Sequence, residues 1–99
     1  MKQEYRISSR DSALEELKTL CLRLGGTPLT VGPTSFEFRS REDEPSAAMP
    51  DASVHLHDDH IWFCDNGGPS EFVAPVFMKL LNVALRHSNE PDGIRIAQP

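Results

Sequence analysis

Apolar and polar residues recur with regular spacing along most of the chain, and the spacing predicts the structure of each segment. Alternation at every second position is typical of a strand with one buried face. A strand is expected over residues 3–8, where Tyr5 and Ile7 alternate with polar residues. We expect Gly32 and Pro33 to turn the chain between a second and a third strand. The same alternation predicts strands around Leu29 and Val31, around Phe36 and Phe38, and over residues 54–57, 60–63 and 94–97.

Spacings of three and four residues predict two helices. The apolar stripe of the first helix is formed by Leu14, Leu17, Cys21 and Leu24. This helix is expected to begin at a capping box made by Ser12 and Glu15 and to end at glycines 25–26. The second helix should cover about Ser70–His87, with a weakened opening because Pro75 lacks an amide hydrogen.

The predicted order is strand, helix, four strands in two hairpins, helix and strand, within a single domain over residues 1–99. This order indicates an α+β fold. We expect a two-layer sandwich in which two helices cover one face of a mainly antiparallel sheet of five to six strands. Residues 40–52 contain two prolines, several small residues and the acidic run 42–44, so a mobile loop is expected there.

Residues 54–63, VHLHDDHIWF, are predicted to form a hairpin whose turn consists of Asp58 and Asp59. In this register Leu56 lies opposite Ile61, and side chains alternate between the two faces. One face then holds Val54, Leu56, Ile61 and Phe63. The other face holds His55, His57, His60 and Trp62. A shift of one residue would scatter the aliphatic side chains, so the register is internally consistent.

Composition and charge narrow the classes of partner. Of 99 residues, 38% are hydrophobic and 25% charged, as in an ordinary globular domain. The formal net charge is −5, from 10 Lys plus Arg and 15 Asp plus Glu, which argues against general binding to nucleic acids or anionic membranes and favours a basic partner. The sequence shows no secretory signal and no membrane-spanning run. Cys21 and Cys64 are interpreted as buried free thiols, so a cytoplasmic location is expected.

The spelling HLHDDH, residues 55–60, resembles the first ligand motif of the metallo-β-lactamase fold family. The resemblance implies metal ligands at His55, His57, Asp59 and His60. It covers six residues only, and that fold needs a longer chain and two further histidines, where only His87 remains. The alternative that survives is a smaller zinc site, or a metal-dependent enzyme built on it, because cross-strand neighbours lie about 5 Å apart. Its ligands would be His55, His57 and His60.

No catalytic motif is evident elsewhere in the chain. Neither Cys64 nor any serine is placed next to a base by a recognisable motif. The DNGG segment, residues 65–68, lacks the Gly-Lys-Ser/Thr of a phosphate-binding loop and is interpreted as a turn. We expect His87 to cap the second helix or to be satisfied by hydrogen bonds near its end. A non-catalytic protein is therefore expected, without a required cofactor.

The sequence favours a protein-binding or regulatory module that binds another protein or itself. Apolar residues cover well over half of the circumference of the second helix, more than packing on one sheet requires. Trp62 stands among histidines on the outer face of the hairpin, and tryptophan is a typical interface anchor. The candidate binding residues are Trp62, His55, His57, His60, Phe77, Met78, Leu81 and Leu85.

Overall fold

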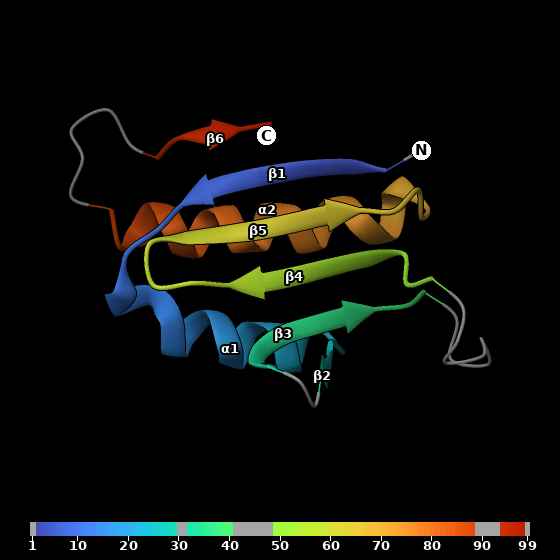
Figure 1. The fold of residues 1–99 in the computed structure, drawn as a ribbon, viewed down its shortest axis with the longest axis horizontal. Helices are drawn as coiled ribbons and strands as arrows, with labels where there is room; N and C mark the ends of the chain where they lie inside the picture. The colour runs from blue at the N-terminus through green and yellow to red at the C-terminus, as the bar shows by residue number, and fades with distance from the viewer. Residues whose placement is uncertain (1, 30–31, 41–48, 89–93, 99) are drawn as a thin grey trace.

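The computed structural model describes residues 2–29, 32–40, 49–88 and 94–98. Within them, six strands form one antiparallel sheet in the order β2-β3-β4-β5-β1-β6, and two helices lie on the same face of it (Figure 1). The strands are β1 (Gln3–Ser8), β2 (Thr27–Leu29), β3 (Gly32–Phe38), β4 (Ala52–Leu56), β5 (His60–Asp65) and β6 (Ile96–Ala97). The predicted two-layer α+β fold is confirmed.

The first helix, α1 (Leu14–Arg23), ends where the glycines predict. Gly25 has a φ of 89°, in the left-handed region that glycine occupies without a steric penalty. The amide of Gly26 then donates to the Cys21 carbonyl oxygen at 2.8 Å, which satisfies an otherwise unpaired group of the last turn.

The predicted capping box at the start of α1 is wrong. A 3-10 turn, η1 (Asp11–Ala13), precedes the helix, so the N-cap is Ala13, which makes no side-chain capping bond. The amide of Ala13 donates to the Arg10 carbonyl at 2.9 Å and thereby begins the turn earlier than the sequence suggests. Ser12 instead faces His87 at the end of the second helix, and Glu15 pairs with Lys18 at 3.3 Å.

The second helix, α2 (Ser70–Arg86), begins at the predicted residue although Pro75 lies inside it. The carbonyl of Pro69 accepts bonds from the amides of Phe72 at 3.0 Å and Val73 at 2.9 Å, so the first turn is closed before the proline. Pro75 is exposed, and water can reach the carbonyl that lacks its helical donor. The helix ends at Arg86, one residue before the prediction.

One predicted connection needs correction, and another lies mostly outside the described residues. Gly32 does not turn the chain, because it begins β3 and pairs with Leu29 next to a register irregularity in β2. The predicted strand residue Val31 and most of the predicted mobile loop, residues 41–48, lie outside the described residues. The described end of that loop is held in place, because the Ser40 amide donates to the Asp51 carboxylate at 2.6 Å.

The hairpin register within β4 and β5 is confirmed. Leu56 pairs with Ile61 and His55 with Trp62, and the amide of His57 closes the turn on the carbonyl of His60 at 2.9 Å. Alternate residues of the strands therefore point toward the helices and form the sheet's half of the core. These residues are Ile7, Phe36, Phe38, Ala52, Val54, Leu56, Ile61 and Phe63.

The helices contribute the other half of the core. Their buried residues are Leu17, Leu20, Cys21, Val73, Val76, Leu80, Val83 and Ala84. Cys21 and Cys64 are buried free thiols, as predicted, and burial raises the pKa of Cys21 to about 12. Neither of the described helices combines the length and the apolar character that crossing a bilayer demands.

Candidate functional site

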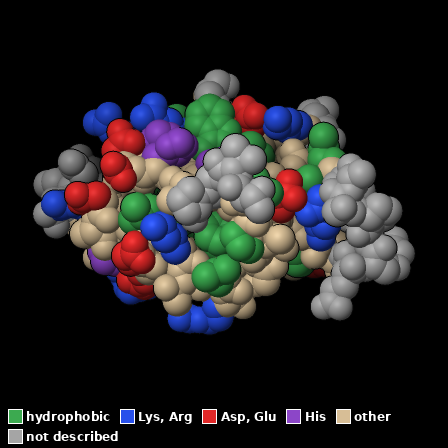
Figure 2. Space-filling model, turned by 60° about the horizontal axis from the view of Figure 1, so that its bottom comes forward, with side chains coloured by type: hydrophobic (Ala, Val, Ile, Leu, Met, Phe, Trp, Pro, Cys, Tyr) green, Lys and Arg blue, Asp and Glu red, His purple; other side chains and the backbone are tan. Residues whose placement is uncertain are grey.

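The face of the sheet opposite the helices carries the predicted histidines and tryptophan, and we call it the outer face. Strand pairing aligns one residue from each of five strands directly across it. This row consists of Ser35, His55, Trp62, Arg6 and Ala97. With strands about 4.8 Å apart, the row extends over roughly 19 Å with Trp62 at its centre. Figure 2 shows histidine side chains gathered beside a hydrophobic group, with acidic and basic side chains around them.

Trp62 is partly buried and not fully exposed. Its neighbours across the strands are His55 on β4 and Arg6 on β1, whose side chains stand on the same face. The indole therefore lies among polar side chains with one part open to solvent.

His55 is fixed by a hydrogen bond to the strand beside it. Its Nδ1 lies 2.9 Å from the Ser35 hydroxyl oxygen. Partial burial lowers the pKa of His55 below its usual value, and the charge of His57 lowers it further. The ring is thus a neutral, oriented hydrogen-bonding group near neutral pH.

His57 and His60 stack on each other beside the turn of the hairpin. Their ring centroids are 4.2 Å apart and their planes differ by 13°. His60 Nδ1 lies 2.6 Å from an Asp59 carboxylate oxygen, and this bond is the main reason that the pKa of Asp59 is lowered. The pair therefore presents an aromatic stacking surface beside an acidic side chain.

The three histidines do not converge as zinc ligands would. Stacked rings direct their nitrogens along parallel planes, whereas a tetrahedral ion needs them aimed at one point. In the parts of the chain that the structure describes, no group of three or more His, Cys, Asp or Glu side chains is arranged to hold a metal ion. His55 is in addition directed toward Ser35.

A cleft of about 280 Å³ adjoins the histidine pair. It is lined by Arg6, Ser8, Asp59, His60, Arg95 and Ala97. Arg6 and Asp59 face each other at 4.0 Å, a long separation for an ion pair. The local sequence pattern gave no indication of the two arginines, because β1 and β6 join the hairpin only through the strand order.

The four predicted residues on α2 divide into two groups. The Phe77 ring packs edge-on against Tyr5 at 5.2 Å and Phe63 at 5.1 Å, and Leu81 packs against the core. Met78 and Leu85 remain 53% and 49% exposed. Half of the predicted surplus apolar surface is therefore used by the core, and half is open.

An apolar pocket of about 220 Å³ lies where α2 crosses β1 and β5. Its walls are Tyr5, Phe63, Asp65, Ser70, Val73, Ala74 and Phe77. Three of these residues are aromatic, while Asp65 and Ser70 add polar atoms. Asp65 is already engaged, since its carboxylate accepts a bond from the Gly67 amide at 2.9 Å.

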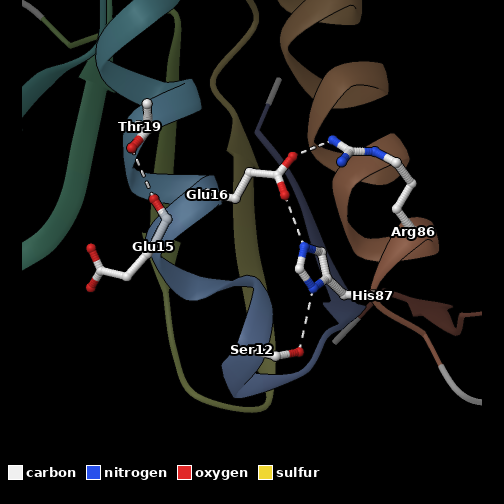
Figure 3. A network of polar contacts seen from close by, with 6 residues as sticks. All are labelled: Ser12, Glu15, Glu16, Thr19, Arg86 and His87. Atoms are coloured by element: carbon white, nitrogen blue, oxygen red, sulfur yellow. Dashed lines mark hydrogen bonds and ion pairs between the residues drawn. The ribbon is translucent and has the colours of Figure 1, made fainter.

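A polar network joins the start of α1 to the end of α2 (Figure 3). His87 Nε2 lies 2.8 Å from one Glu16 carboxylate oxygen, and Arg86 pairs with the other. Since a carboxylate can only accept, His87 Nε2 donates this bond, and His87 Nδ1 lies 3.4 Å from the Ser12 hydroxyl oxygen. The bond from His87, followed by that from Arg86, lowers the pKa of Glu16.

This network contains the residue types of a serine hydrolase but lacks the accompanying features. In a hydrolase triad the serine contacts Nε2 and the acid contacts Nδ1, the reverse of the arrangement at His87. Ser12 is exposed at the long limit of a hydrogen bond, and none of the four residues lines either cavity described above. The network holds the two helices together. His87, which was expected to be satisfied by hydrogen bonds near the end of α2, is its central member.

Comparison of the chain with known protein families, with curated proteins and with solved structures finds no match. The function must therefore be inferred from the surfaces themselves.

Proposed function

We propose that this protein is a non-catalytic protein-binding module that engages another protein through the outer face of its sheet. The proposal is carried by one observation: Trp62 occupies the centre of a five-strand row on a sheet face that neither helix covers. Packing of the core does not require a tryptophan there. Tryptophan and arginine are the residues most enriched among those that dominate binding energies, and Arg6 is the direct neighbour of Trp62.

The surroundings of Trp62 have the composition expected of an interface rim. Charged side chains two residues apart pair on the same face, Arg39 with Glu37 at 2.9 Å and Lys2 with Glu4 at 3.1 Å. A hydrophobic centre within a polar border is the usual anatomy of a non-obligate interface. The formal net charge of −5 favours a partner with basic groups, and the buried thiols suit a reducing, cytoplasmic setting.

The proposal is tested by capture of the partner with matched variants. Immobilised wild-type protein, Trp62→Ala and Lys79→Ala are exposed to an extract of the native cells, and retained proteins are identified by mass spectrometry. Lys79 is exposed on α2, away from the outer face, and serves as the control. A protein retained by wild type and Lys79→Ala but lost with Trp62→Ala supports the proposal.

The affinity of the captured protein is then measured directly. Trp62 is the chain's single tryptophan, so its fluorescence reports on the proposed site without a label. Loss of a central anchor costs about 2 kcal/mol or more of binding free energy, so Trp62→Ala should raise the dissociation constant about 30-fold. Equal affinity of wild type and Trp62→Ala, with unchanged Trp62 fluorescence on binding, would contradict the proposed face.

A further inference from the structure

We infer that two copies of this chain associate through α2, each placing the residues Ala74, Met78, Leu81 and Leu85 against the same residues of the other copy. We call these four residues the α2 flank. The α2 flank lies on the helical side of the sheet, opposite the outer face. The inference therefore stands or fails independently of the partner proposed for the outer face.

The α2 flank is a narrow apolar stripe centred away from the buried face of the helix, although Leu81 also packs against the core. At 100° per residue its four positions fall within about 60° of the helix circumference, roughly 140° from the centre of the buried face. Arg86 reaches α1 on one side of the helix, and Phe77 reaches Tyr5 of β1 on the other. The α2 flank lies on the Phe77 side of the helix, toward β1 and the edge strand β6 (Figure 1).

The open part of this stripe is substantial. Met78 and Leu85 are 53% and 49% exposed, Ala74 is exposed, and Leu81 is partly buried. Ile96 of β6 is 48% exposed at the neighbouring sheet edge. An exposed apolar stripe of this length is typical of a protein-binding helix face.

The spacing of the α2 flank fits a second copy. The four positions are separated by four, three and four residues, so the stripe has the same spacing in both chain directions. In an antiparallel pair, Ala74 of each copy lies opposite Leu85 of the other, and Met78 lies opposite Leu81. Small residues then meet large ones, whereas a parallel pair would place Leu85 on Leu85 and leave a gap at the Ala74 end.

The apolar pocket supplies a place for the large residue. Ala74 forms part of its wall, together with Tyr5 and Phe77. A volume of about 220 Å³ exceeds that of a leucine side chain, so Leu85 of the second copy can enter it. The antiparallel arrangement also brings the Glu71 end of each helix to the Arg86 end of the other, which is favourable for the helix dipoles.

Sedimentation equilibrium over roughly 1–500 μM protein tests the association. Wild type should pass from monomer to dimer within this range, while Leu85→Glu should raise the dissociation constant of the dimer at least tenfold. Leu22→Glu is the matched control, because Leu22 is an equally exposed leucine on α1, at 56%. Thermal unfolding confirms that both variants fold. A wild-type monomer at every concentration, or a dimer that Leu85→Glu leaves intact, would overturn the inference.

Disulfide cross-linking tests the direction of packing. In the antiparallel pair the two copies of position 78 are offset by three residues along the axis, about 4.5 Å, but those of position 85 by eleven residues, about 16.5 Å. Met78→Cys should therefore cross-link on mild oxidation and Leu85→Cys should not. The native cysteines Cys21 and Cys64 are buried, so the oxidised wild-type protein measures the background level of cross-linking. Efficient cross-linking of both variants would indicate parallel packing and refute the arrangement, and Trp62→Ala should leave the dimer unchanged.

Discussion

The two faces of the sheet use the same strands for different purposes. Phe63 and Trp62 are adjacent in β5, yet Phe63 is 1% exposed against the helices while Trp62 stands among His55 and Arg6. Large aromatic residues on the inner face are explained by packing alone. The tryptophan on the outer face has no such explanation, and for this reason it is the residue on which the proposed binding face depends.

The faces also differ in how they treat polarity. No polar or charged residue is buried among the described residues, so the buried part of the inner face is entirely apolar. The outer face instead pairs its polar groups with one another, His55 with Ser35 across two strands and Arg39 with Glu37 along the chain. Folding therefore restricts the inner positions to side chains that fit the core, whereas at the outer positions it requires only that polar groups find hydrogen-bond partners.

The largest expected effect comes from comparing Phe63→Ala with Trp62→Ala. Phe63→Ala leaves a cavity in the core and should lower the free energy of unfolding by about 3–5 kcal/mol. Trp62→Ala removes a partly exposed ring and should cost about 1–2 kcal/mol. Urea denaturation of both variants provides the measurement. Equal losses would mean that the outer face is a second core layer, and the distinction between the faces would fail.

A smaller effect is expected where the inner face meets the end of α1. A methyl group on Gly26 would lie 2.8 Å from both the Cys21 carbonyl oxygen and the ring of Phe38. Gly26→Ala should therefore cost about 1–3 kcal/mol, since the buried backbone must shift. A methyl group on Gly25 would meet open space, so the only cost of Gly25→Ala is the backbone φ of 89°. We expect the free energy of unfolding to fall by about 1 kcal/mol. Urea denaturation in which Gly25→Ala proves the more damaging variant would show that packing at Gly26 is loose.

Local periodicity accounts for what could be predicted. The hairpin register followed from residues 54–63 alone, because only one register collects its aliphatic residues on a single face. The two helices followed in the same way from their apolar stripes. These signals arise from neighbours within a few residues of one another, and they do not depend on the strand order.

Contacts between distant segments account for what could not be predicted. Arg6 joins the site because β1 pairs with β5, a pairing that no local pattern encodes. Ser12 was assigned to a cap from its spacing to Glu15, but the tertiary contact with His87 and the extra turn at η1 decided its place. On α2 the pattern identified the apolar arc correctly, although the division between core and surface depends on where Tyr5 and Phe63 lie.

The smallest expected effect separates the faces by their response to pH. Burial, together with the charge of His57, holds the pKa of His55 below its usual 6.5 in the folded state. As the pH falls through 6.5, the unfolded chain binds a proton at this position before the folded chain does, so stability is lost. His55→Gln keeps a hydrogen-bonding group beside Ser35 but does not titrate. The free energy of unfolding of wild type should therefore fall more steeply between pH 7.5 and 5.5 than that of His55→Gln.

The control for this prediction lies one residue away on the inner face. Val54→Ala removes buried methyl groups that do not titrate, so it should lower the free energy of unfolding by the same amount at pH 7.5, 6.5 and 5.5. Urea denaturation at the three pH values compares the variants, and the ring proton shifts of His55 give its pKa directly. A pKa for His55 at or above 6.5, or parallel pH profiles for wild type and His55→Gln, would show that His55 is as hydrated as in the unfolded chain. The outer face would then lack the partial burial that orders its side chains for binding.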